Sequence, residues 1–116
     1  MSARARLVAM AAAVALACLP ATVRADSGND LWSQCTGKSS SFNTGICYGY
    51  VKAIAEVMAV SPNGIHGFRA CFPEGNTGGQ AVDVVKRYLD QNPEQRHLAG
   101  LFLVPSALAE AFPCNR

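Results

Sequence analysis

The residues best suited to chemistry are the cysteines and histidines, because thiols and imidazoles serve as nucleophiles, bases and metal ligands. The chain has five cysteines, and His66 stands five residues before Cys71. Thiol catalysis needs a free cysteine beside a base. In an exported chain, however, Cys71 is expected to be oxidised and His66 to be an ordinary loop residue.

Other catalytic and ligand-binding motifs are missing from the sequence. The two histidines are far apart, and neither a CxxC pair, a CxxCH motif nor a GxSxG motif occurs. The glycine-rich run at residues 75–79 could bind an anion. No strand precedes this run and it lacks the lysine of a phosphate loop, which favours a plain helix cap. We therefore expect no enzyme, no cofactor and no metal site.

The N-terminal segment is typical of a secretory signal peptide. Arg4 and Arg6 precede an apolar run too short to span a membrane, and small residues suited to a signal peptidase end at Ala25. We expect a signal peptide at residues 1–25, a mature domain at residues 26–116, and a periplasmic or secreted location. The alternative is a lipoprotein with Cys18 lipidated, but an alanine stands before Cys18 where a larger aliphatic residue is usual.

The net charge changes when this signal is removed. Seven basic residues then remain against eight acidic ones, a net charge of −1 in place of +2 for the whole chain. Nothing in this balance indicates nucleic acid or an anionic membrane as a partner. No later segment is long and apolar enough to cross a bilayer, so no membrane association is expected after cleavage.

Four cysteines remain in the mature domain, which predicts a disulfide framework with three possible connectivities. We favour Cys35–Cys47 and Cys71–Cys114, because each bond would close its own helical hairpin. In the loop-entropy model they stabilise the fold by roughly 3 and 4 kcal/mol. For a domain with a core of limited size, that is a large share of the total stability.

The stretch from Cys71 to Cys114 is predicted to be a helical hairpin. Thr77 with Gln80 forms a capping box, and apolar residues then recur at helical spacing. A second box, made by Asn92, Pro93 and Gln95, is predicted to open the next helix. That helix is expected to have Leu98, Leu101 and Phe102 on its apolar side and, because of Pro105, a kink or break near Val104.

Two further helices are predicted upstream. A short helix is expected to begin from a cap at Asn29 or Asp30, and a longer one from Phe42 or Asn43. Gly49 inside the longer helix is tolerable if another helix approaches closely there. No stretch alternates with period two for long enough to form a strand. The expected fold is all-α, a compact bundle of four to five helices stapled by two disulfides.

Several motifs, taken together in this order, resemble those of one known family. They are Gly28-Asn29 with Leu31 and Cys35; Cys47 with Gly49-Tyr50; Cys71, Pro73, Gly75, Thr77 and Gln80; VVKRYLDQNPE at 84–94; and ALAEAFPC at 107–114. The combination resembles the Rap/Tai family of small exported helical proteins, over nearly the whole mature chain.

The resemblance implies a periplasmic immunity protein of a type VI secretion system. Such proteins bind and inhibit a peptidoglycan amidase by occluding its papain-like cleft, often as homodimers. The function is implied here by analogy at the level of the fold. Two alternatives come from other classes: a periplasmic chaperone or stress-response protein that exposes apolar helices on acidification, and an accessory subunit of an envelope complex.

If the protein inhibits a toxin, its partner-binding residues are expected in two exposed irregular segments, Pro62 to Phe68 and Pro73 to Asn76, because loops on a rigid scaffold often carry specificity. The candidate residues are Pro62, Asn63, His66, Phe68, Pro73, Glu74 and Asn76. His66 with Phe68 could plug a cleft of the partner. The alternative is that both segments are ordinary connectors.

Overall fold

The computed structural model describes residues 22–37 and 40–114. This part of the chain forms four α-helices: α2 (Gly28–Thr36), α3 (Ser41–Val60), α4 (Gly78–Gln91) and α5 (Gly100–Ala111). A short 3₁₀ helix, η1 (Pro93–Gln95), precedes α5. Over the same residues the only β-type pairings are two isolated bridges, Ser27–Ala99 and Ile65–Phe68. The predicted all-α fold is confirmed, whereas the predicted signal peptide lies almost entirely outside the described residues.

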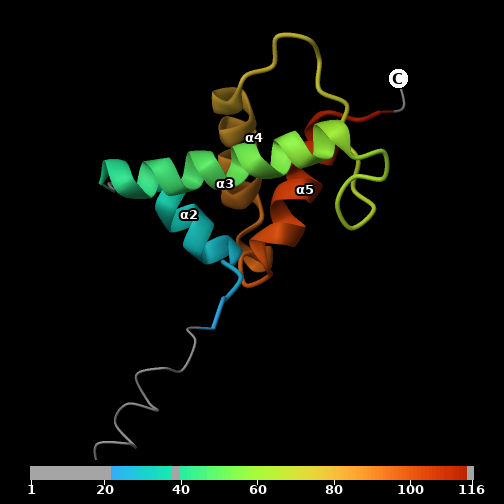
Figure 1. The fold of residues 1–116 in the computed structure, drawn as a ribbon. Coiled ribbons are helices and arrows are strands. Elements are labelled where there is room, and N and C mark those ends of the chain that lie inside the picture. Colours follow the sequence, from blue (N-terminus) through green and yellow to red (C-terminus); the bar gives the residue numbers. More distant parts are fainter. Residues whose placement is uncertain (1–21, 38–39, 115–116) are drawn as a thin grey trace, which may run out of the picture.

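Helix α3 is the longest element and packs against the other three helices. Figure 1 shows it lying across α4 and α5, with α2 against its N-terminal half. Both favoured disulfides are confirmed. Cys35–Cys47 joins α2 to α3, and Cys71–Cys114 joins the segment before α4 to the segment after α5.

The core lies where the apolar faces of the four helices meet. In α4 the buried residues are Ala81, Val85 and Leu89, one helical turn apart, as the period of 3.6 residues requires. The complete buried apolar core consists of Leu31, Cys47, Val51, Ile54, Met58, Ala70, Ala81, Val85, Leu89, Leu103, Val104, Ala107 and Leu108. None of the buried residues in the described part is polar or charged.

Side-chain caps fix where α2 and α4 begin. The Thr77 hydroxyl accepts from the Gln80 N–H at 3.2 Å, and the Gln80 side chain accepts from the Thr77 N–H at 2.8 Å. This is the predicted capping box. The cap predicted at Asn29 or Asp30 is wrong by two or three residues. Ser27 is the N-cap of α2, and Asp30 is the third helical residue that closes the box with it.

The start of α5 differs from the prediction. The Asn92 side chain donates to the Tyr88 carbonyl at 2.8 Å, and the Gln95 side chain accepts from the Tyr88 hydroxyl at 3.0 Å. Both polar groups are thus turned back toward α4, so the second capping box does not form. Helix α5 begins later, at Gly100, whose N–H donates to the Asp26 carbonyl at 2.7 Å.

Two other expectations fail for reasons of packing. No helix approaches Gly49, since a Cβ built there meets nothing within 4 Å. The break predicted near Val104 does not occur either, because α5 is continuous although Pro105 lies inside it. Pro105 has no N–H to donate to the carbonyl of Leu101, a residue that is 43% exposed, and its own ring is buried in the core.

None of the helices in the part of the chain that the structure describes is long and apolar enough to cross a membrane.

Candidate functional site

Both segments predicted to bind a partner lie in the long connection between α3 and α4. The chain leaves the end of α3, forms one loop beside α5, and then passes through a second loop to the start of α4 (Figure 1). We call these the first loop, residues 61–68, and the second loop, residues 73–76. Cys71, which forms a disulfide with Cys114, lies between the two loops.

The first loop ends in a tight reverse turn. Ile65 and Phe68 exchange two backbone hydrogen bonds, with N···O distances of 3.0 and 2.9 Å. The two residues between them, His66 and Gly67, have φ angles of 51° and 81°. Positive φ at both central residues defines a type I′ turn. The end of the segment that was predicted to be irregular is therefore a defined two-residue turn.

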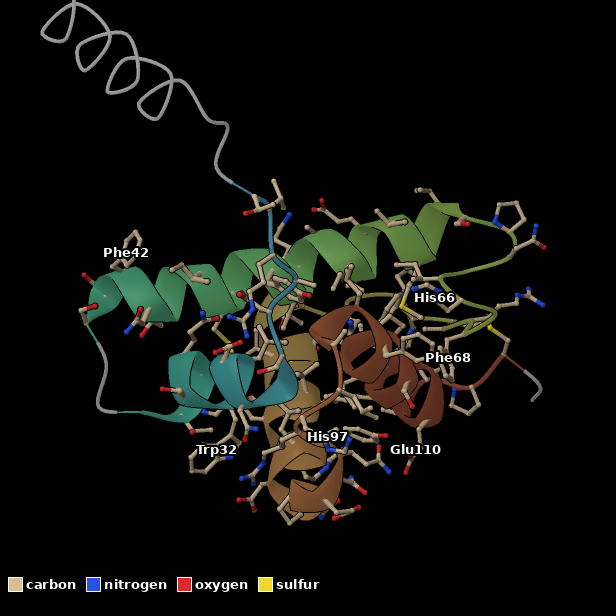
Figure 2. The ribbon with its side chains drawn as sticks, turned by 90° about the horizontal axis from the view of Figure 1, so that it is seen from below. Trp32, Phe42, His66, Phe68, His97 and Glu110 are labelled. Carbon is tan, nitrogen blue, oxygen red and sulfur yellow. A yellow bond between two sulfur atoms is a disulfide. The ribbon has the colours of Figure 1, made fainter. Side chains whose placement is uncertain are left out.

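This turn places two aromatic rings against α5. The His66 ring stacks on the Phe102 ring with the centroids 4.7 Å apart, and Phe68 meets Phe102 edge-on at 6.4 Å. Figure 2 shows His66 and Phe68 side by side next to α5. Phe102 itself remains 50% exposed. The result is an aromatic cluster at the surface, built from the first loop and the first turn of α5.

The start of the first loop is also held in place. The Gly64 N–H donates to the Ser61 carbonyl at 3.2 Å, and the Ser61 hydroxyl donates to the Gly64 carbonyl at the same distance. Pro62 and Asn63, between them, are exposed. Pro62 and Asn63 therefore lie at the tip of a short turn whose two ends are joined by hydrogen bonds.

The second loop is a tight turn in which the Asn76 N–H donates to the Pro73 carbonyl at 3.1 Å and Gly75 has a φ of 81°. Glu74 is exposed at its tip. A ring contact between Phe72 and Phe112, with centroids 5.1 Å apart, anchors its beginning to the end of α5.

An open cleft lies on each side of the second loop. The larger has a volume of about 380 Å³ and is bounded by the loop, by α4 and by Phe112. Its charged residues are Glu74, Asp83 and Arg87. The smaller cleft, of about 260 Å³, lies between the loop, α3 and the start of α4. Pro73 and Asn76 line both clefts, so the second loop forms the ridge between them.

The charges around the smaller cleft are already paired within the protein. Lys52 and Glu56, four residues apart on α3, form an ion pair at its edge, the only one among residues 22–37 and 40–114. The hydrogen bond that the Lys52 ammonium donates to Glu56, followed by the negative charge of Glu56, raises the pKa of Lys52. Glu74 at the ridge is exposed and forms no ion pair with a basic residue of the described part.

The contribution of residues 98–102 to this surface differs from the sequence-based expectation. Leu98, Leu101 and Phe102 were expected on the buried side, but all three are exposed. A signal was present in the four consecutive apolar residues from Leu101 to Val104. Such a run surrounds the whole helix, so one face can bury only part of it, here Leu103 and Val104.

The arrangement contains no group of three or more histidine, cysteine, aspartate or glutamate side chains that could hold a metal ion, as far as the chain is described. What the two loops offer is a surface: an aromatic cluster, a ridge with a free carboxylate, and two clefts. A family model described as Rap1a immunity proteins matches residues 27–114, which span all four helices and both disulfides. No curated protein and no solved structure matches the chain.

Proposed function

The chain belongs to the Rap1a family of immunity proteins, and from this membership we propose that it binds and inhibits a peptidoglycan amidase delivered by a type VI secretion system. The match over residues 27–114 carries the proposal. In this proposal the chain is exported by its signal peptide, acts in the periplasm, and works by binding without catalysing a reaction.

We place the amidase contact on the two loops between α3 and α4. Inhibition by occlusion needs a surface that is already ordered before the partner arrives, since ordering it on binding lowers the affinity. Two hydrogen bonds and two ring contacts hold His66 and Phe68 in place. Half-exposed aromatic rings of this kind are typical of interface hot spots. Glu74 adds a carboxylate at the ridge of the second loop.

Binding is tested with the oxidised protein purified from the periplasm and with amidase-like proteins encoded beside its gene. We expect a complex of fixed stoichiometry in which hydrolysis of peptidoglycan by the amidase is lost. The measurements are titration calorimetry and release of soluble peptidoglycan fragments. If the oxidised protein leaves every such amidase fully active, the proposed function is wrong.

The contact surface is tested with single substitutions. Replacing a hot-spot side chain by alanine typically costs more than about 1.4 kcal/mol of binding free energy, or tenfold in affinity. We expect His66→Ala or Glu74→Ala to weaken amidase binding by about that factor. Phe42→Ala is the control, because Phe42 is an aromatic residue 73% exposed near the opposite end of α3 (Figure 2). An effect of Phe42→Ala as large as that of His66→Ala would place the interface elsewhere.

A further inference from the structure

The two disulfides lie in different surroundings. Cys47 is only 2% exposed, Cys35 is half-buried, and both belong to helices, α2 and α3. Cys71 is exposed, Cys114 is half-buried, and neither lies in a helix. A reducing thiolate must reach a sulfur atom along the axis of the disulfide, so access decides which bond reacts. By this criterion the Cys71–Cys114 bond is the accessible one.

An open cleft leads to this bond. It has a volume of about 200 Å³, and both Cys71 and Cys114 line it together with Pro62 of the first loop and Arg69. Arg69 is exposed and forms no ion pair with an acidic residue of the described part. A guanidinium at the mouth of the cleft attracts an incoming thiolate and stabilises the thiolate that leaves.

We propose that the Cys71–Cys114 disulfide is a reducible clamp on the two loops, opened by a dithiol reductant while Cys35–Cys47 stays oxidised. One thiolate of the reductant attacks the Cys71 sulfur, the disulfide bond breaks, and Cys114 leaves as a thiolate that takes up a proton. The second thiol of the reductant, as its thiolate, then displaces Cys71 from the mixed disulfide. The reductant ends as a disulfide and the protein gains two thiols, a transfer of two electrons.

The opening is local. Without the bond, the segment around Cys71 is still joined to the end of α5 by the hydrogen bond from the Cys71 N–H to the Phe112 carbonyl, at 2.8 Å, and by the ring contact of Phe72 with Phe112. The first loop keeps its ring contacts with Phe102. The helices keep their core and the Cys35–Cys47 bond. We therefore expect the loops to become mobile in a protein that stays helical. The effect on amidase binding rests on the proposed function, since a mobile loop must be ordered again when the partner binds.

The test of selectivity needs no toxin. The oxidised protein is exposed to limiting dithiothreitol, quenched over time with N-ethylmaleimide, and digested for mass spectrometry. We expect Cys71 and Cys114 to be labelled at least about tenfold faster than Cys35 and Cys47, with the far-ultraviolet circular dichroism preserved, because burial protects a disulfide from exchange. Equal rates for the two bonds, faster labelling of Cys35 and Cys47, or loss of helicity together with the first labelling would overturn the proposal.

A second variant tests the part assigned to Arg69. A unit positive charge near a reacting thiolate stabilises it, so Arg69→Gln should slow reduction of Cys71–Cys114 by about threefold at low ionic strength. Arg87→Gln is the control, because Arg87 is an exposed arginine that lines a different cleft. If both variants react at the wild-type rate, the electrostatic role of Arg69 is refuted.

The consequence for binding is measured with a double variant, Cys71→Ser with Cys114→Ser, which carries no bulky label. We expect it to bind the amidase at least about tenfold more weakly than the oxidised protein, as loss of loop order implies. Unchanged affinity after selective reduction would refute the clamp while leaving the proposed function intact. If the oxidised protein binds no amidase, the proposed function fails, and the labelling rates still decide whether the bond is selectively reducible.

Discussion

His66 shows how a single residue can be held in an unfavourable backbone conformation by its surroundings. It is the only non-glycine residue in the described part with a positive φ. The left-handed conformation costs an L-residue other than glycine roughly 1–2 kcal/mol. The two hydrogen bonds of the turn and the stacking on Phe102 offset this cost. Strain retained at an exposed residue is consistent with a role in binding.

Gly64 is the glycine of the first loop that cannot be replaced. Its φ is 65°, and a Cβ at this position would collide with the carbonyl oxygen of Phe68. We predict that Gly64→Ala lowers the free energy of unfolding by about 2 kcal/mol or more, since strain and a clash add. Urea denaturation measures this change in the free energy of unfolding. Gly67→Asn is the control, because a Cβ at Gly67 meets open space and asparagine tolerates this conformation. Equal losses for both variants would contradict the role of the Phe68 contact.

Arg96 joins three parts of the fold through one side chain. Its Nε donates to the Leu89 carbonyl near the end of α4 at 2.6 Å, and its guanidinium lies 4.3 Å from the centre of the Trp32 ring on α2. We predict that Arg96→Ala lowers the free energy of unfolding by about 2 kcal/mol, the sum of a charged hydrogen bond and a cation–π contact. Arg96→Lys should recover only part of this loss, because an ammonium lacks the planar fork. Full recovery by lysine would show that charge alone matters. Chemical denaturation of the wild type and both variants measures these differences in the free energy of unfolding.

At the scale of elements, the capping boxes decide where helices begin. We predict that Thr77→Ala lowers the free energy of unfolding by about 1 kcal/mol, the usual cost of an N-cap, because the Gln80 N–H loses its acceptor. Thr77→Ser keeps the hydroxyl and should remain within about 0.5 kcal/mol of the wild type, as serine caps at least as well. Thermal unfolding by circular dichroism measures both. A serine variant as unstable as the alanine variant would mean that the threonine methyl group, not the cap, is important.

The capping box of α2 makes stability depend on pH. The Ser27 N–H, and then the Ser27 hydroxyl, donate to the Asp30 carboxylate and lower its pKa below the ordinary value of 3.8. A lowered pKa in the folded state gives a contribution that is complete above pH 3.8 and is lost as the pH falls through the lowered pKa. We predict that the stability difference between the wild type and Asp30→Asn shrinks on acidification below this value. Urea denaturation at pH 7 and at pH 3 tests this; an unchanged difference would contradict it.

At the scale of the whole molecule, the two disulfides differ in the length of chain that they close. The cysteines are 12 residues apart in Cys35–Cys47 and 43 apart in Cys71–Cys114. The loop-entropy model gives stabilisations of about 3 and 4 kcal/mol. We predict that replacing both cysteines by serine costs more for the Cys71–Cys114 pair, measured by urea denaturation. The opposite order would show that burial of Cys47 in the core outweighs the entropy of the longer loop.

The sequence by itself determined the local features of this protein. Three such features were predictable: the capping box of Thr77 with Gln80, the apolar period of α4 and the pairing of the four cysteines. The capping box and the apolar period depend on residues close in sequence. The disulfide pairing depends on helical hairpins, each of which brings its two ends together. The resemblance of several motifs to those of a known family also indicated the family, and the family model over residues 27–114 agrees with it. The two candidate loops were recognisable as irregular for the same reason, since proline and glycine interrupt a helix locally.

Only the tertiary structure decided which apolar residues are left at the surface and where polar side chains turn. Asn92 and Gln95 bond to Tyr88 on the preceding helix and do not cap α5, a choice between partners that spacing cannot reveal. Phe102 is exposed because the core accepts one face of α5, and the turn of His66 folds over it from a distant part of the chain. The accessibility of Cys71–Cys114 is likewise a property of packing. The partners of Asn92 and Gln95, the exposure of Phe102 and the accessibility of Cys71–Cys114 all depend on tertiary contacts, and no local sequence pattern encodes them.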